Sequence, residues 1–145
     1  MTQLAEAPAG GAVPLCERLT QEGIPLNVTA IFTLEQVRAV VNAVKGGAPA
    51  YVSVFAGRIA DTGVDPVPLM AEAVHRLAAV PNTELIWASP RELLNIFQAD
   101  AIGCHIITVT NDILQKLSLG RDLSEYSLDT VKMFYNDGMA AGFAL

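Results

Sequence analysis

The sequence contains few of the patterns that identify a protein's chemistry at once. Among its 145 residues are only two cysteines, Cys16 and Cys104, and their separation fits no metal site. There is no glycine-rich phosphate loop of the dinucleotide or P-loop kind. No apolar run approaches the roughly 20 residues that span a bilayer. A metal, a nucleotide cofactor and a membrane span are therefore not predicted.

Basic residues are also scarce. Nine lysines and arginines stand against 15 aspartates and glutamates, which gives a net charge of -6. A nucleic-acid-binding surface needs the opposite balance. The start of the chain lacks the basic and apolar segments of a signal peptide, and a buried thiol is the ordinary state of cysteine in a reducing compartment. We therefore expect a cytoplasmic protein that binds neither nucleic acid nor membrane and needs no cofactor.

Apolar residues, in contrast, are abundant. They make up 52% of the chain and charged residues only 17%, a balance that suits a sheet covered by helices. Residues 1–12 are rich in alanine, glycine and proline and predict a loose tail. Residues 13–145 are long enough for one compact domain.

Strand-like and helix-like segments alternate four times in that domain. The predicted strands are 24–31, 50–55, 84–88 and 105–109, and predicted helices precede, separate and follow them, the last beginning at Ser127. This rhythm favours an α/β fold with a parallel sheet and right-handed crossovers. A closed eight-stranded barrel typically needs about 250 residues, so the length alone fits a small open sheet.

Two of the helices begin with a recognisable capping sequence. Thr33 and Gln36 have the spacing of a capping box, and Ser89 and Glu92 repeat it with a proline between them. Asp65 is expected to cap the helix that follows the second strand.

The carboxyl ends of the strands carry polar and cationic residues. These are Asn27, Thr29, Ser53, Arg58, Ser89 and Arg91. Because such ends share one edge of a parallel sheet, the side chains can converge there on an anion such as phosphate. A simpler interpretation stays open, in which Asp61 pairs with Arg58 and Ser89 only caps a helix. Trp87 and His105 fit core positions as well as a pocket.

Three ordered segments resemble strand-end motifs of the transaldolase family. They are Asn27–Phe32, Ser53–Ile59 followed by Asp61, and Ala88–Arg91, and the resemblance runs from about Val13 to Leu145. The match is closer to the short bacterial members, which include the fructose-6-phosphate aldolases. That family is a (β/α)8 barrel, and this chain resembles its carboxyl half, strands five to eight. Its members transfer a dihydroxyacetone unit between sugar phosphates, as in the pentose phosphate pathway, through a lysine Schiff base.

The resemblance implies roles for individual residues at a sugar-phosphate site. Arg58, Ser89 and Arg91 correspond to the residues that bind the phosphate. Thr29 corresponds to the threonine that helps position a catalytic water for proton transfer.

Other positions correspond to the pocket around the sugar. Asn27 and Ser53 match polar groups that line it, and Phe55 stands where some aldolases have tyrosine, which favours the transaldolase side of the family. Pro90 replaces an aromatic residue that is common between the matching serine and arginine, and this leaves the preferred acceptor open.

The chain departs from the family at the reacting lysine. The family's Schiff-base lysine belongs to the fourth strand and its aspartate to the first, whereas Lys45, Lys116 and Lys132 all fall in predicted helices or helix ends. We therefore expect the chain to be inactive alone, through a genuine truncation or a misplaced start. It would then act as a homo-oligomer or pair with an amino-terminal half-barrel. The alternative is a non-catalytic sugar-phosphate-binding or assembly module.

Overall fold

Four parallel strands form one sheet in which the order in space equals the order in sequence. The structure is a computed structural model that describes residues 11–120 and 122–143. The strands are β1 (Leu26–Ile31), β2 (Ala50–Val54), β3 (Thr83–Trp87) and β4 (Ile106–Ile107). The helices are α1 (Val13–Gln21), α2 (Leu34–Val44), α3 (Ala56–Ala60), α4 (Val67–Leu77), α5 (Leu94–Ala101), α6 (Asn111–Leu117) and α7 (Leu123–Ala140). The predicted α/β fold is confirmed, and it is consistent with half of a (β/α)8 barrel.

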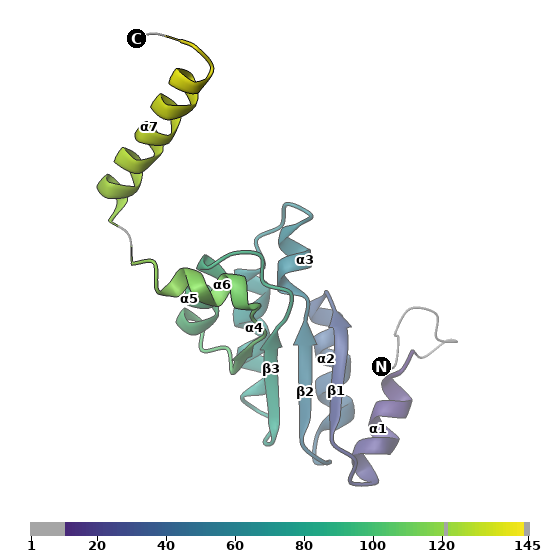
Figure 1. Cartoon of the computed structure of the whole chain (residues 1–145). Helices are drawn as coiled ribbons and strands as arrows, with labels where there is room; N and C mark the ends of the chain where they lie inside the picture. The colour runs from purple at the N-terminus through teal and green to yellow at the C-terminus, as the bar shows by residue number, and fades with distance from the viewer. Residues whose placement is uncertain (1–10, 121, 144–145) are drawn as a thin grey trace.

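The core lies between the sheet and the helices α2 and α4, which cover one face of it (Figure 1). Side chains alternate across a strand, so every second residue of β2 faces these helices. Val52 and Val54 are completely buried there, together with Val37 of α2 and Met70 of α4. Trp87 of β3 is also fully buried, and it belongs to this core.

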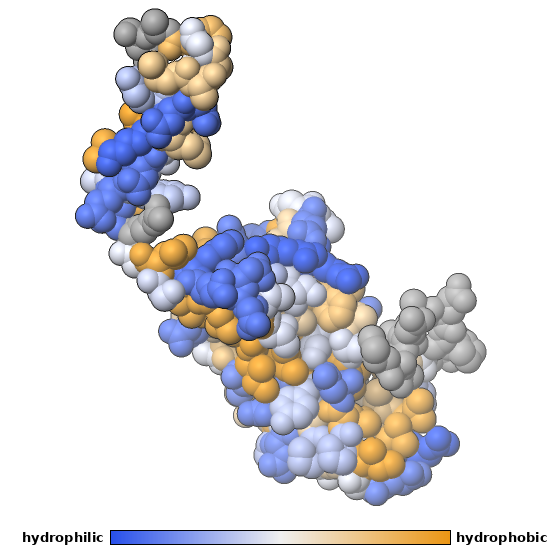
Figure 2. Space-filling view, viewed as in Figure 1, coloured by the Kyte–Doolittle hydropathy of each residue, from blue (hydrophilic) through white to orange (hydrophobic). Residues whose placement is uncertain are grey.

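The opposite face of the sheet carries no helix over β1 and β2 in the described part of the chain (Figure 1). Asn27 and Tyr51 are neighbours on it and are exposed, and Ser53 follows Tyr51 by one strand period. In the same view, polar and apolar residues mix on this face, and strongly hydrophilic residues gather around α3 and the start of α5 (Figure 2). We call it the open sheet face. In a complete barrel the corresponding face points inward.

Local sequence signals predicted several element boundaries. Thr33 and Gln36 form the predicted capping box, because the threonine Oγ1 accepts from the Gln36 N–H at 3.2 Å and Gln36 Oε1 accepts from the Thr33 N–H at 3.1 Å. Asp65 Oδ1 accepts from the N–H of Val67 at the start of α4, as expected.

Other predicted boundaries are wrong. The second capping box does not form: Asn95 Oδ1 accepts from the N–H groups of Arg91 and Glu92, and α5 begins only at Leu94. Residues 56–60, for which no element was predicted, form the short helix α3, and β4 is two residues long instead of five.

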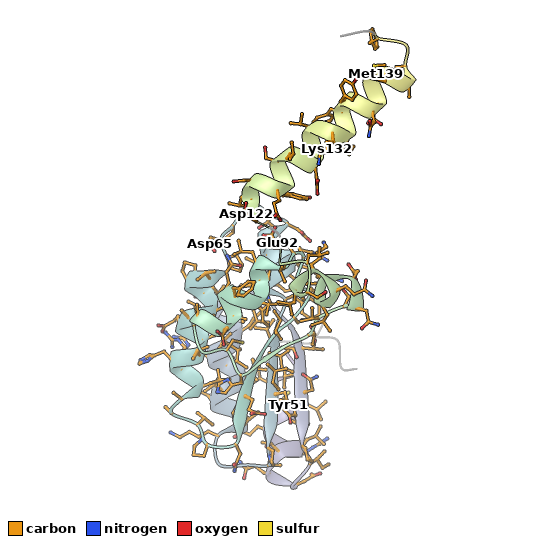
Figure 3. All side chains as sticks on the ribbon, turned by 60° about the vertical axis from the view of Figure 1, so that its left-hand side comes forward. Tyr51, Asp65, Glu92, Asp122, Lys132 and Met139 are labelled. Atoms are coloured by element: carbon orange, nitrogen blue, oxygen red, sulfur yellow. The ribbon has the colours of Figure 1, made fainter. Side chains whose placement is uncertain are left out.

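The last helix also differs from expectation. It begins at Leu123 and not at Ser127, because Asp122 Oδ1 accepts from the N–H groups of Ser124 and Glu125. In Figures 1 and 3, α7 projects away from the rest of the molecule. None of its 18 described residues is buried. Within the described ranges, no helix is long and apolar enough to cross a membrane.

The predicted amino-terminal tail falls mostly outside the described residues, which begin at Gly11. α1 starts at Val13, with Pro14 in its first turn. The boundary between tail and domain therefore stays a prediction.

Candidate functional site

The candidate site lies at the end of the sheet to which the strands point, where α3 follows β2 and residues 88–93 follow β3 (Figure 1). The two segments touch at Gly57. A Cβ on this glycine would lie 1.5 Å from the carbonyl oxygen of Ser89 and 3.3 Å from Cγ of Arg91. The Gly57 N–H also donates to the carbonyl oxygen of Ala88 at 3.3 Å. Only glycine permits this approach, which brings the segments carrying Arg58 and Arg91 together.

Arg91 is held by a carboxylate from the other segment. Its Nε lies 3.1 Å from both Oδ1 and Oδ2 of Asp61, and its Nη2 lies 2.5 Å from Oδ2. The two side chains are about half exposed, at 48% and 51%. The predicted anion at Arg91 is therefore present, but it is a carboxylate of the chain itself. Arg91 precedes α5, which begins at Leu94.

Arg58 does not pair with Asp61, contrary to the simpler interpretation of the sequence. Its guanidinium carbon lies 5.1 Å from the centre of the Phe55 ring, a cation–π contact. Phe55 in turn packs edge-on against Phe32, with ring centres 5.7 Å apart. Among the described residues no carboxylate forms a salt bridge with Arg58. Its donors are thus available to an external anion.

Ser89 adopts an unusual backbone conformation at this rim. Its φ is +58°, in the left-handed region, and Ala30 at the end of β1 has a φ of +63°. Non-glycine residues pay about 1–3 kcal/mol for such a conformation, and such residues are concentrated at functional sites. Within the described ranges the Ser89 hydroxyl has no hydrogen-bond partner, so it is also available to a ligand.

Asn27 and Ser53 come together on the open sheet face. Ser53 Oγ donates to Asn27 Oδ1 at 2.7 Å, which joins β1 to β2 below the rim. Thr29 follows Asn27 by two residues and is half-buried, next to the register irregularity that ends β1. The structure thus joins Asn27 and Ser53 by a hydrogen bond, and within the described residues the Thr29 side chain forms no hydrogen bond with either.

The described residues offer no other obvious reactive group. Burial raises the pKa of the Cys104 thiol, whose Sγ lies 3.4 Å from the Ile106 carbonyl oxygen, so it stays protonated at neutral pH. No cluster of metal-binding side chains occurs among the residues that the structure describes.

The three lysines of the sequence lie on helices or at the end of one, and none lies on a strand of the sheet. Lys45 ends α2, Lys116 belongs to α6 and Lys132 to α7, and all three are exposed. Figure 3 shows Lys132 midway along the projecting helix.

The sequence did not indicate the roles of two residues of the site. No role was predicted for Gly57, and Asp61 was considered only as a partner for Arg58, which lies three residues earlier. The Asp61–Arg91 pair spans 30 residues, and no local pattern signals it.

Comparison with known proteins identifies the family of this chain. Residues 9–143 match the Transaldolase/Fructose-6-phosphate aldolase family. A probable transaldolase of Nitrosopumilus maritimus is 36% identical over 104 residues, covering 70% of this chain and 45% of that protein. Probable transaldolases of Methanococcus maripaludis and Clostridium kluyveri are 39% and 41% identical over 100 and 101 residues, each covering 68% of this chain and 45% of the relative. The chain therefore spans less than half the length of these relatives.

Proposed function

Because the chain belongs to the transaldolase/fructose-6-phosphate aldolase family, we propose that its rim binds the phosphate group of a sugar phosphate. Arg58, Ser89 and Arg91 supply the donors. The close contact at Gly57 is the observation that carries this proposal, because it joins the segments on which both arginines stand. A phosphate bound at this rim could accept charge-assisted hydrogen bonds from both guanidinium groups, which are stronger than those from neutral donors.

The open sheet face would then accommodate the sugar. Asn27 presents an exposed amide just below the rim, and the buried Ser53 orients it through their mutual hydrogen bond at 2.7 Å. A sugar hydroxyl can exchange for either partner of that bond. We assign Thr29 the family's water-positioning role, since it stands on the same strand, one period closer to the rim.

Phosphate binding can be tested with inorganic phosphate on the 145-residue chain. Arg58→Ala and Arg91→Ala should each weaken binding about tenfold or more, since a charge-assisted hydrogen bond contributes about 1.5–3 kcal/mol. Arg18→Ala is the matched control, because Arg18 is an exposed arginine of α1 whose Nε lies 3.9 Å from Glu22 in a weak surface pair. Equal affinities for all four proteins would contradict the proposal.

We further propose that this chain lacks the covalent step on its own. A Schiff-base lysine needs a lowered pKa in a desolvated pocket beside the substrate carbonyl. The exposed positions of Lys45, Lys116 and Lys132 on helices support the absence of such a group. Borohydride reduction in the presence of fructose 6-phosphate should therefore leave the intact mass unchanged. A reduced adduct on any of these lysines would show that the chain forms a Schiff base.

The reaction of the family would then require a second polypeptide surface. The open sheet face has exposed strand residues, and α7 exposes apolar side chains such as Leu128, Val131 and Phe134. These surfaces support association with a second copy or with a half-barrel that supplies the lysine. Light scattering that shows a stable monomer at micromolar concentration, alone and with such a partner, would contradict this. The free thiols Cys16 and Cys104 suit the reducing cytoplasm as the compartment.

If no lysine-bearing partner exists, the same rim makes the chain a sugar-phosphate-binding module. Phosphate binding without any Schiff base in the chain's native assembly would favour this second function.

A further inference from the structure

Asp61 occupies the donors of Arg91 that a phosphate would use. Its carboxylate meets the edge of the guanidinium formed by Nε and Nη2, and both carboxylate oxygens lie within hydrogen-bond distance of Nε. This is the forked arrangement that arginine also forms with phosphate. One N–H cannot serve both anions at full strength.

The two arginines of the rim therefore differ. The Arg58 guanidinium lies over the Phe55 ring and has no carboxylate partner among the described residues, whereas the charge of Arg91 is compensated by Asp61. The rim consequently offers an approaching ligand one uncompensated cation and one cation that must first exchange its partner.

We propose that Asp61 is an internal competitor for the anion site, and that the ligand's phosphate displaces it from Arg91. The inference rests on the proposed phosphate site. A carboxylate carries one negative charge, and a phosphate monoester carries up to two at neutral pH. Asp61 thus selects ligands by their charge: a dianionic phosphate displaces its carboxylate from Arg91, whereas a monovalent anion does not. In this role Asp61 is a specificity-determining residue that makes no contact with the sugar.

The exchange leaves the surrounding fold in place. The ion pair is half exposed on both sides, so its contribution to stability is small. The segment that carries Asp61 is anchored separately, by the contact of Gly57 with Ser89 and by the backbone N–H of Asp61, which donates to the Gly57 carbonyl oxygen at 3.0 Å. The carboxylate can therefore rotate away while α3 keeps its position.

Titration of the 145-residue chain with inorganic phosphate tests this. Asp61→Asn keeps the size of the side chain and removes its charge, and it should tighten phosphate binding about three- to tenfold. Glu92→Gln removes a neighbouring exposed carboxylate that forms no salt bridge within the described chain, and it should change affinity less than twofold. In an Arg91→Ala background the effect of Asp61→Asn should disappear, which a purely structural role of Asp61 would not produce.

The outcomes separate this inference from the function on which it rests. If wild type binds phosphate and Asp61→Asn binds equally or more weakly, Asp61 is not a competitor, and the phosphate site stands. If Glu92→Gln tightens binding as much as Asp61→Asn does, the effect is general charge, and the inference also fails. If neither wild type nor Asp61→Asn binds phosphate, both proposals fall. Binding by Asp61→Asn alone would support the competitor strongly.

Discussion

Replacing Gly57 with alanine is the most direct perturbation of the rim. The new Cβ would lie 1.5 Å from the Ser89 carbonyl oxygen and 2.6 Å from its carbonyl carbon, whereas real Cβ contacts stay above 3.0 Å. Both obstructing atoms belong to the backbone, so no side-chain rotation relieves the clash. α3 and the segment at Ser89 must separate by about 1.5 Å for the contact to reach that limit.

Three contributions determine how much Gly57→Ala lowers the free energy of unfolding. Forced overpacking costs about 1–3 kcal/mol, and loss of the hydrogen bond from the Gly57 N–H to the Ala88 carbonyl costs about 1 kcal/mol. Alanine regains about 1 kcal/mol because Gly57 lies in a helix with ordinary φ. The variant should therefore lose about 1–3 kcal/mol. With roughly 4 °C for each kcal/mol in a domain of this size, its Tm should fall by about 4–12 °C.

Circular dichroism during heating, together with phosphate titration, measures both consequences. Phosphate binding should weaken about tenfold or more, because the separation moves Arg58 away from Arg91. Gly138→Ala is the control: this glycine lies in α7, and its added Cβ would meet nothing within 4 Å. That variant should keep wild-type phosphate affinity and unfold no earlier. If Gly57→Ala matches wild type in both measurements, the two segments do not depend on this contact.

Three further changes have defined outcomes. Ser53→Ala should lower the free energy of unfolding by about 1 kcal/mol in urea titrations, because it removes the 2.7 Å bond to Asn27; an unchanged midpoint would count against that bond. The Asp122 pKa lies below its ordinary 3.8 because the Ser124 N–H donates to the carboxylate. The cap should therefore stabilise α7 above that pH, and the stabilisation should be lost as the pH falls through the lowered pKa. An ordinary Asp122 pKa in an NMR titration would show that the cap is absent. Burial raises the pKa of the Cys104 thiol, so at pH 7.5 it should react with a thiol reagent more slowly in the native chain than in urea, and equal rates would refute its burial.

Structure that depends on a few neighbouring residues was predictable from the sequence. The capping box at Thr33 and Gln36 forms within one helical turn, and the alternate apolar residues of β2 need only the helix layer on one face of the sheet. The strand ends that carry Arg58 and Arg91 followed from the alternation of strands and helices, and the structure brings their segments into contact.

Competition between local partners explains the wrong helix boundaries. Ser89 and Glu92 have the spacing of a capping box, but the side chain of Asn95 reaches the same N–H groups from inside the helix. Asp122 likewise captures two N–H groups upstream of the predicted cap Ser127. Sequence spacing identifies the candidates in such cases and does not rank them.

The partner of Asp61 could not be deduced in the same way. Proximity along the chain favoured Arg58, three residues earlier, as the partner of Asp61. In the folded chain the Asp61 carboxylate pairs with Arg91, 30 residues later. Stacking on Phe55 holds the Arg58 guanidinium over the ring, and the close approach at Gly57 brings Arg91 within reach. Both causes depend on the packed sheet.

The projecting helix α7 gives the proposed association a spectroscopic consequence. Isolated helices of about 12–15 residues are marginal in water, and most helical stability in proteins comes from a buried apolar face. None of the described residues of α7 is buried, so in a lone chain little tertiary packing adds to its Asp122 cap and internal contacts. Any partner that covers Val131 and Phe134 would supply the missing stabilisation. If the chain associates through these side chains as proposed, the ellipticity at 222 nm should weaken on dilution, and a signal independent of concentration would contradict that association.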